Sequence, residues 1–519
     1  MHAIVEGTKM VLNSEVSNIH FPEKLFGTYI HDEIVKFGDS VALLDPQSGA
    51  ELTFQELKEQ ALNFAERLLT FEIKKGDVVA LVVPFQPKFI ALTIGVALTK
   101  ATVAFYNIDG KLPEILTILR SSEPTICIVD HRRANFTIDE LKKNLKSLNT
   151  IFSVDEIERV NPDGTQLSND QSLRDTDVYN DPLCMFYTSG TTGEPKAVVV
   201  ANHAMVALAE CGKRAFPLER GDAAITLCTR LHAFSIGVTL IYLALGVKHV
   251  VVSSLSPENF TNYVSKYCVK GIMMADPFSL SKIVDEVEKP SPSLQFLLGT
   301  GTTYPPILIE KARKKFGITV GSIWGSTETS LITISTSNSS PAESVGRLLP
   351  TVSLKVLDIV SGQEVSANAK GELCVKSPFS FKGYSAQADH QALAKNSEEW
   401  FRTGDIGVYD ENGFVYVVGR IKDIIKCDGS PVVYPVELEG VLMSHPGVAD
   451  VAVTRVEHPL YVEAPKAFIV KRDPNLTKEE LLEYFNEKVS KHKMLHGGIE
   501  FIDTIPRNSV GKPLKRFLV

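Results

Sequence analysis

Short continuous apolar runs alternate with segments of helical period along the first three quarters of this chain. Residues 76–107, GDVVALVVPFQPKFIALTIGVALTKATVAFYN, show the pattern clearly: an apolar run, a Pro-led helical stretch and a second strand-like run. Similar units follow at PTICIVDHRR, at KHVVVSSLSPENFTNYVSKY and at PPILIEKARKKFGITVGSIWG. Apolar strands joined by helices are typical of parallel sheets covered on both faces. The pattern therefore predicts a layered α/β fold.

The pattern changes near Gly371. Short strands and turns follow, such as GELCVK and DENGFVYVVGR with its Asn-Gly turn, and they predict a β-barrel-like part. After Arg420 the last residues read as strands around a charged helix, TKEELLEYFNEKVSKH. A chain of 519 residues also exceeds the roughly 250 to 300 residues at which one core stops growing. We predict a large N-terminal domain, 1–420, and a small α+β domain, 421–519.

Composition excludes several classes of protein. A net charge of −8 without a long basic run argues against nucleic acid as the main partner. The seven Cys contain no C-x-x-C pair, which argues against a zinc site and favours a reducing compartment. The N-terminus lacks the pattern of a signal peptide, and no apolar run reaches the roughly 20 residues of a membrane span. We expect a cytoplasmic protein with no integral membrane segment. The sequence makes no prediction of the oligomeric state.

One stretch, YTSGTTGEPK at 187–196, concentrates hydroxyls, two Gly and a Lys directly after an apolar run. Gly allows close backbone approach, and N–H groups, hydroxyls and a Lys can all face phosphate oxygens. A solvated polar loop is the alternative interpretation. The stretch lacks the G-K-[S/T] ending of a Walker A motif, so an ordinary P-loop NTPase is disfavoured.

Four further motifs give this stretch a context. They are GSTE at 325–328, FRTGD at 401–405, GRIKDIIKCDG at 419–429 and PRNSVGK at 506–512. In this order and spacing the chain resembles the adenylate-forming superfamily of acyl-CoA synthetases, luciferases and peptide-synthetase adenylation domains. The resemblance covers nearly the whole chain, beginning with LTFQEL at 52–57, and departs at Ala197, where the family usually has Gly. It implies that a carboxylic acid and ATP form an acyl adenylate with the help of magnesium.

The resemblance assigns roles to single residues around the phosphates. Thr327 resembles the residue that bonds the α-phosphate, and Glu328 the carboxylate that holds magnesium, an ion that prefers oxygen ligands. The loop around the β- and γ-phosphates is expected to comprise Ser189, Gly190, Thr191, Thr192, Gly193 and Lys196.

The nucleoside end is assigned in the same way. Trp324 stands beside Gly325 where the family usually has a Tyr stacked on adenine; the larger ring can stack, but the phenol's hydrogen bond is lost. Asp405 resembles the carboxylate that accepts hydrogen bonds from both ribose hydroxyls, and Arg420 its partner. An isolated T-G-D would be an ordinary turn, so both assignments depend on the family context.

The C-terminal motifs imply two half reactions. Lys512 matches the lysine that bridges the substrate carboxylate and the α-phosphate during adenylation. In the family the small domain then swings about a hinge, here Lys422, which brings in a loop that lines the pantetheine channel of CoA. That loop contains Gly429, where a missing side chain suits a narrow passage, and Lys426 matches a position used in this step.

The acyl site is predicted from two segments. His232 matches the family's aromatic or His gate near the carboxylate, and a packed His in an apolar turn is the alternative. Gly299, Thr300 and Gly301 match the floor of the acyl pocket, where Thr300 adds bulk and a hydroxyl. We therefore expect a pocket that is narrower or more polar than usual.

The predicted function is an acid:CoA ligase that activates a fatty or aromatic carboxylic acid with ATP, magnesium and CoA. The segment GELCVKSPFSFKGY is most similar to the 4-coumarate-CoA ligase and acyl-CoA synthetase branch. Loading of an acyl or amino acid onto a separate carrier protein is the main alternative, and light emission by a luciferase is a minor one. A binding protein without turnover is disfavoured because Lys196, Glu328, Asp405 and Lys512 are all present.

Overall fold

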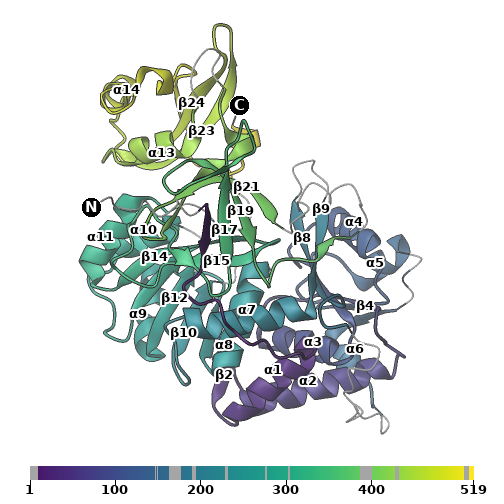
Figure 1. Ribbon diagram of the computed structural model, residues 1–519. Helices are drawn as coiled ribbons and strands as arrows, with labels where there is room; N and C mark the ends of the chain where they lie inside the picture. Colours follow the sequence, from purple (N-terminus) through teal and green to yellow (C-terminus); the bar gives the residue numbers. More distant parts are fainter. Residues whose placement is uncertain are drawn as a thin grey trace, which may run out of the picture.

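The structure is a computed structural model in which a large body carries a smaller C-terminal unit, drawn at the top of Figure 1 with α13, α14, β23 and β24. It describes residues 10–145, 148, 150–162, 177–189, 195–227, 232–274, 277–301, 304–385, 400–426, 432–507 and 513–518.

The first layer is a seven-stranded sheet. The segment 76–107 forms the predicted strand, helix and strand, β4, α3 (Pro87–Leu98) and β5, and β4 and β5 are parallel. Parallel pairing runs from β8 through β7, whereas β9 and β20 at the other edge are antiparallel. In spatial order the strands are β20 (Gly383–Tyr384), β9 (Pro195–Ala201), β8 (Pro182–Ser189), β5 (Thr102–Phe105), β4 (Val78–Val82), β6 (Ile126–Val129) and β7 (Ile151–Ser153).

The second layer is a nine-stranded sheet. Its strands from β14 to β2 are parallel, with antiparallel β15, β16 and β3 at the edges. In spatial order they are β16 (Arg347–Leu348), β15 (Ser330–Ile334), β14 (Thr319–Ser326), β13 (Phe296–Gly299), β12 (Val269–Met274), β10 (Ala223–Leu227), β11 (Lys248–Val252), β2 (Val41–Leu44) and β3 (Glu51–Thr53).

Helices cover these sheets, as the continuous apolar strands require. All residues of β4 and β10 are buried, because neither face of these strands meets water. The most apolar helices, α3 and α8 (Ala233–Leu245), are buried along most of their length and pack with α1 (Phe26–Ile34), α2 (Phe54–Leu69) and α7 (Asn202–Ala215). One large core joins side chains of both sheets to these helices. Further helices are α4 (Leu112–Ser122), α5 (Ile138–Asn144), α6 (Val154–Arg159), α9 (Pro257–Lys266), α10 (Pro277–Glu286) and α11 (Pro306–Phe316).

A third, antiparallel sheet stands where the sequence predicts short strands and turns. Residues of GELCVK form β19, and those of FVYVVGR form β22. The α/β layers with this sheet confirm the predicted fold class. Its strands are β1 (Val11–Asn13), β17 (Ser353–Leu357), β18 (Glu364–Val365), β19 (Gly371–Lys376), β21 (Phe401–Tyr409) and β22 (Val415–Arg420).

The C-terminal unit has a core of its own, which includes Leu438, Ile469 and Phe485. It contacts the body through Ile424 and Tyr434, which pack on Ile406. Lys422 lies exposed in a short 3-10 helix, Ile421–Asp423, and rotation about it stays a prediction. The elements of the unit are α13 (Pro435–Met443), β23 (Val448–His458), β24 (Val462–Lys471), α14 (Lys478–Asn486) and β25 (Ile499–Phe501).

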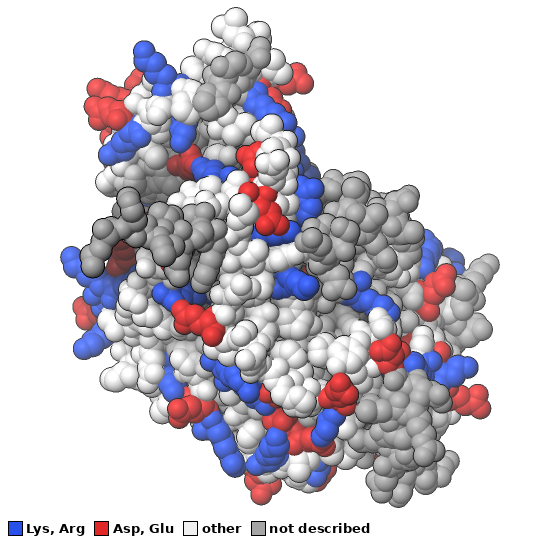
Figure 2. Space-filling model, viewed as in Figure 1, with Lys and Arg blue, Asp and Glu red and all other residues white. Residues whose placement is uncertain are grey.

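Positive and negative side chains are interspersed on the visible face of the molecule. Figure 2 shows Lys and Arg among Asp and Glu, without a large area of one sign over the described residues of this face. Among the described residues, none of the helices combines the length and the hydropathy that crossing a membrane would require.

Candidate active site

The predicted phosphate loop connects two antiparallel strands. Ser189 is the last residue of β8, Lys196 is the second residue of β9, and the backbones pair at Thr188 and Lys196. Ser189 and Lys196 are therefore held close together at one end of this strand pair. Of the predicted loop, Gly190, Thr191, Thr192 and Gly193 lie outside the described residues.

Glu328 reaches the same strand pair through Tyr384. Tyr384 lies in β20, which pairs with β9, and its ring centroid is 5.6 Å from Lys196 Nζ. The Tyr384 hydroxyl donates a hydrogen bond to Glu328 Oε1 over 2.9 Å. Burial, followed by the charge of Glu328, raises the pKa of Tyr384, so the hydroxyl keeps its proton. The structure thus brings together the predicted residues Lys196 and Glu328, and the residue between them is one that the sequence analysis did not assign.

The turn that carries Thr327 and Glu328 is stabilised by its own side chains. It connects β14 to β15, and the N–H groups of Ser326 and Thr329 each donate to the other residue's hydroxyl, at 3.0 and 3.2 Å. Gly325 precedes it, and a Cβ there would lie 1.9 Å from the Ser330 carbonyl oxygen. The Gly and Ser of the GSTE motif are therefore needed to bring the strand and the turn together.

Asp405 is held from two sides at the nucleoside end. It is 5 % exposed, and its Oδ2 accepts a hydrogen bond from Trp324 Nε1 over 2.9 Å. Its Oδ1 lies 2.7 Å from Arg420 Nε, across the register pair of β21 and β22. The contact between Trp324 and Asp405 joins the α/β body to the antiparallel sheet over 81 positions of sequence. The structure therefore brings all three predicted residues together.

His232 begins helix α8. Its Nδ1 accepts a hydrogen bond of 3.3 Å from the Phe234 N–H group. Burial lowers the pKa of His232, and Glu328 acts in the opposite direction. The ring is therefore neutral at pH 7, with the proton on Nε2. His232 therefore has the local contacts of a helix cap, and the charge of Glu328 also acts on its pKa.

The predicted acyl floor carries an unpredicted aromatic ring. Gly299 ends β13, and a Cβ at this position would lie 2.4 Å from the Tyr304 ring. The Tyr304 hydroxyl and the Thr300 N–H group both donate to the Met274 carbonyl oxygen, at 2.9 and 3.0 Å. Gly301 has a φ of 77°, which favours glycine. The space that the missing side chain of Gly299 leaves is thus occupied by Tyr304.

The predicted residues of the second step are only partly described. Lys426 is exposed, and its N–H group donates to Glu463 Oε2 over 2.9 Å, within the C-terminal unit. Gly429 and Lys512 lie outside the described residues.

Comparison with known proteins identifies the family of this chain. The sequence pattern described as AMP-binding enzyme matches residues 30–385, and that of the AMP-binding enzyme C-terminal domain matches residues 437–512. The chain belongs to the AMP-binding enzyme family. This result confirms the resemblance to adenylate-forming enzymes.

Relatives of this AMP-binding enzyme cover almost its full length. "Probable 4-coumarate--CoA ligase 3" of Dictyostelium discoideum is 28 % identical, over 100 % of this chain and 98 % of that protein. "Luciferin 4-monooxygenase" of Luciola mingrelica is also 28 % identical, over 93 % and 91 % of the two chains. The ATP-bound crystal structure of MatB from Rhodopseudomonas palustris has the same fold, with a TM-score of 0.83, 21 % identity and coverage of 94 % and 98 %.

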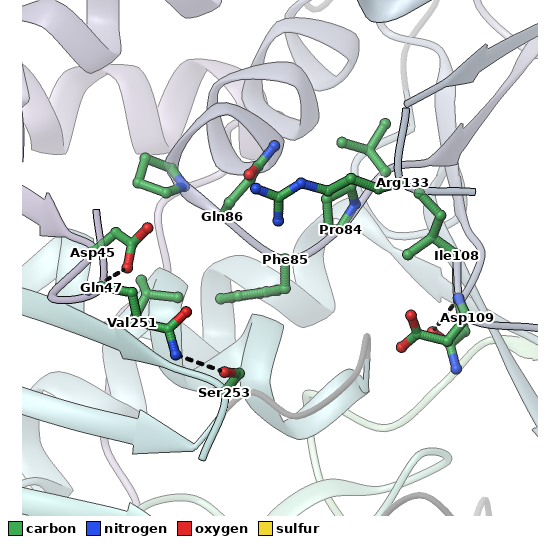
Figure 3. Close-up of a pocket in the computed structure, with 13 residues that line it drawn as sticks. Asp45, Gln47, Pro84, Phe85, Gln86, Ile108, Asp109, Arg133, Val251 and Ser253 are labelled. Atoms are coloured by element: carbon green, nitrogen blue, oxygen red, sulfur yellow. Dashed lines mark hydrogen bonds between the residues drawn. The ribbon is translucent and has the colours of Figure 1, made fainter. Parts of the chain in front are cut away.

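The AMP-binding enzyme also has a hollow of about 200 Å³ that contains none of the predicted site residues. It lies after the carboxyl ends of β4, β5 and β11, between the two large sheets. Figure 3 shows Phe85 between two groups of lining residues, with Asp45 and Ser253 on one side and Asp109 and Arg133 on the other. This hollow is distinct from the contacts around Glu328 and Asp405.

A magnesium ion fits the donor set around Glu328. Within the described ranges, no cluster of three or more His, Cys, Asp or Glu side chains could hold a metal by itself. Magnesium, however, is usually bound by one or two carboxylates together with substrate phosphates. Glu328 provides such a carboxylate, beside the strand pair that carries the predicted phosphate loop.

Proposed function

We propose that this AMP-binding enzyme is an ATP-dependent acid:CoA ligase. It would join a fatty or aromatic carboxylic acid to the α-phosphate of ATP with release of pyrophosphate. It would then transfer the acyl group to the CoA thiol and release AMP. The observation that supports this best is the arrangement after β14, where Tyr384 contacts both Glu328 and Lys196, and Trp324 contacts Asp405.

This arrangement suits the chemistry of adenylation. Two anions, a carboxylate and a phosphate, must approach each other, so cations and donors are needed where negative charge builds. We assign this task to Lys196, to the Thr327 hydroxyl and to Lys512. Magnesium, when bound, would supply further neutralisation of the phosphate oxygens. Trp324 and Arg420 hold Asp405 in place. The carboxylate keeps lone pairs that can accept hydrogen bonds from both ribose hydroxyls.

The acid would lie between His232 and the end of β13. The neutral imidazole of His232 can donate its Nε2 proton to a carboxylate oxygen. Gly299, Thr300 and Gly301 would form the floor, with Tyr304 packed on Gly299. A ring at this position favours flat aromatic or slender aliphatic acids over branched ones.

The second step is assigned to the C-terminal unit. After rotation about Lys422, the loop of Gly429 and Lys426 would line the passage for pantetheine. The CoA thiolate forms a bond to the acyl carbon, the bond from this carbon to the phosphate oxygen breaks, and AMP leaves. The ligase names of relatives support CoA as the acceptor rather than a carrier protein.

Acid-dependent release of pyrophosphate from ATP tests the proposal. A panel of fatty, aromatic and amino acids is assayed with and without CoA, and the products are identified by mass spectrometry. We expect pyrophosphate release with a fatty or aromatic acid and a CoA thioester only when CoA is present. Adenylate without thioester would point to a carrier protein, and no release with any acid would contradict the proposal.

Two variants separate the half reactions. Lys512→Ala should abolish pyrophosphate release but leave thioester formation from a supplied acyl adenylate. Gly429→Leu should block thioester formation while pyrophosphate exchange continues. Equal loss of both half reactions in either variant would contradict the assigned division between the two residues.

A further inference from the structure

We propose that Tyr384 is a positioning residue for the metal-nucleotide, and this inference rests on the proposed function. Its hydroxyl fixes the carboxylate of Glu328, and its ring lies near the ammonium group of Lys196. One side chain thereby sets the relative position of the carboxylate assigned to magnesium and the cation assigned to the phosphates.

The backbone around Tyr384 is tied to both neighbours. The N–H group of Phe381 donates to the Glu328 carbonyl oxygen over 2.7 Å, and that of Ser385 donates to the Ala197 carbonyl oxygen over 2.9 Å. Tyr384 itself pairs with Val198 in the sheet. The short strand β20 is therefore a bridge between the turn after β14 and the strand that begins at the phosphate loop.

A tyrosine is well suited to this position because it is a neutral donor. Among the described residues Glu328 makes no ion pair, so the hydroxyl of Tyr384 orients its carboxylate without neutralising it. A Lys or Arg in the same place would orient Glu328 but would compete with a metal ion for its charge. Removal of a hydrogen bond to a ligating carboxylate typically lowers the metal affinity by 10- to 100-fold.

The two halves of the side chain act on different partners. The hydroxyl contacts Glu328, whereas the ring faces Lys196, whose ammonium group is attracted to the aromatic face. Tyr384→Phe removes the first contact and keeps the second. Tyr384→Leu removes both, so comparison of the two variants separates orientation of the carboxylate from placement of the lysine.

The test measures binding rather than turnover. Mg²⁺ is titrated by calorimetry into the full-length enzyme saturated with a non-hydrolysable ATP analogue, and the analogue is titrated separately in EDTA. Tyr384→Phe should raise the Mg²⁺ dissociation constant about tenfold and leave binding of the analogue in EDTA unchanged. Tyr384→Leu should weaken both.

Tyr416→Phe is the matched control. The Tyr416 hydroxyl also donates to a carboxylate, Asp410 Oδ2 at 3.1 Å, but this pair lies outside the candidate site. Its Mg²⁺ affinity should equal that of the wild type. A similar loss in both variants would mean that removal of any such hydroxyl disturbs the fold, and it would overturn the inference.

A double-mutant cycle with Glu328→Gln completes the test. If Tyr384 acts through Glu328, the Tyr384→Phe change should have no further effect on Mg²⁺ affinity in the Glu328→Gln background. Additive effects, or a wild-type Mg²⁺ affinity in Tyr384→Phe, would overturn the inference alone. A wild-type enzyme that binds no Mg²⁺ with the ATP analogue would overturn the proposed function as well.

Discussion

Two Tyr–Glu hydrogen bonds in this protein have nearly the same length and different surroundings. Between α1 and α7, the Tyr29 hydroxyl donates to Glu210 Oε1 over 2.8 Å. At the candidate site, the Tyr384 hydroxyl donates to Glu328 Oε1 over 2.9 Å. Glu210 also contacts two cations, with Lys213 Nζ at 2.5 Å and Arg214 Nη1 at 3.2 Å.

The difference separates a carboxylate that stabilises the fold from one that we assign to a ligand. The charge of Glu210 is balanced inside the protein, so its removal should weaken the packing of α1 on α7. Glu328 makes no ion pair among the described residues, and its negative charge remains available for a cation that the chain does not supply. Loss of Glu328 should therefore affect function and hardly affect stability.

Glu328→Gln is the variant with the largest expected effect. The amide keeps the shape of the side chain but loses the charge assigned to magnesium. Acid-dependent pyrophosphate release should fall by at least about 100-fold, as expected for a group that stabilises charge in the transition state. The thermal unfolding temperature should change by no more than about 2 °C. A large fall in the unfolding temperature would place Glu328 with Glu210 as a structural residue.

Glu210→Gln should show the opposite pattern. Charge-assisted hydrogen bonds contribute about 1.5 to 3 kcal/mol, and Lys213 and Arg214 are solvated enough to stay charged when their partner is lost. We expect the free energy of unfolding, measured with urea, to fall by about 2 kcal/mol. The turnover number of the folded enzyme should equal that of the wild type. A reduced turnover number at unchanged stability would contradict the distinction between the two carboxylates.

Asp405 is an intermediate case, because its contacts include both a cation, Arg420, and a neutral donor, Trp324. Trp324→Phe keeps an aromatic ring but removes the indole donor that orients Asp405. The KM for ATP should rise roughly tenfold, since a hydrogen bond to a charged group is lost. Trp400→Phe, which changes the only other Trp of the chain, is the control and should leave this KM unchanged. An unchanged KM in Trp324→Phe would show that Asp405 is oriented without the hydrogen bond from Trp324.

The sequence predicted the layers and the motifs better than the contacts between them. The apolar periodicity of residues 76–107 depends on local burial, and it predicted β4, α3 and β5 correctly. The charged segment TKEELLEYFNEKVSKH was predicted to be helical throughout, whereas α14 ends at Asn486; Val489, beyond this end, still packs against the core of the C-terminal unit. Tyr384 ends the segment GELCVKSPFSFKGY, but neither Tyr384 nor Tyr304 was assigned a role from the sequence. Their partners Glu328 and Gly299 are brought to them by β-sheet pairing and packing, which spacing along the chain does not encode.

The smallest expected effect concerns the pH dependence of stability. Burial alone would raise the pKa of Glu210, but hydrogen bonds from Lys213, Tyr29 and Arg214 outweigh it and lower the pKa from its ordinary value of 4.5. Because the folded-state pKa lies below the unfolded one, the contribution of Glu210 is complete above pH 4.5 and is lost as the pH falls through the folded-state value.

Urea unfolding of wild type and Glu210→Gln between pH 7 and pH 3.5 measures this contribution. The difference in free energy of unfolding should be constant at neutral pH and shrink below pH 4.5, because a protonated Glu210 resembles the neutral amide. A difference that stays at its pH 7 value down to pH 3.5 would mean that the Gln side chain perturbs packing rather than charge. The balance of Glu210 by Lys213 and Arg214 would then no longer explain why this Tyr–Glu pair differs from that of Tyr384 and Glu328.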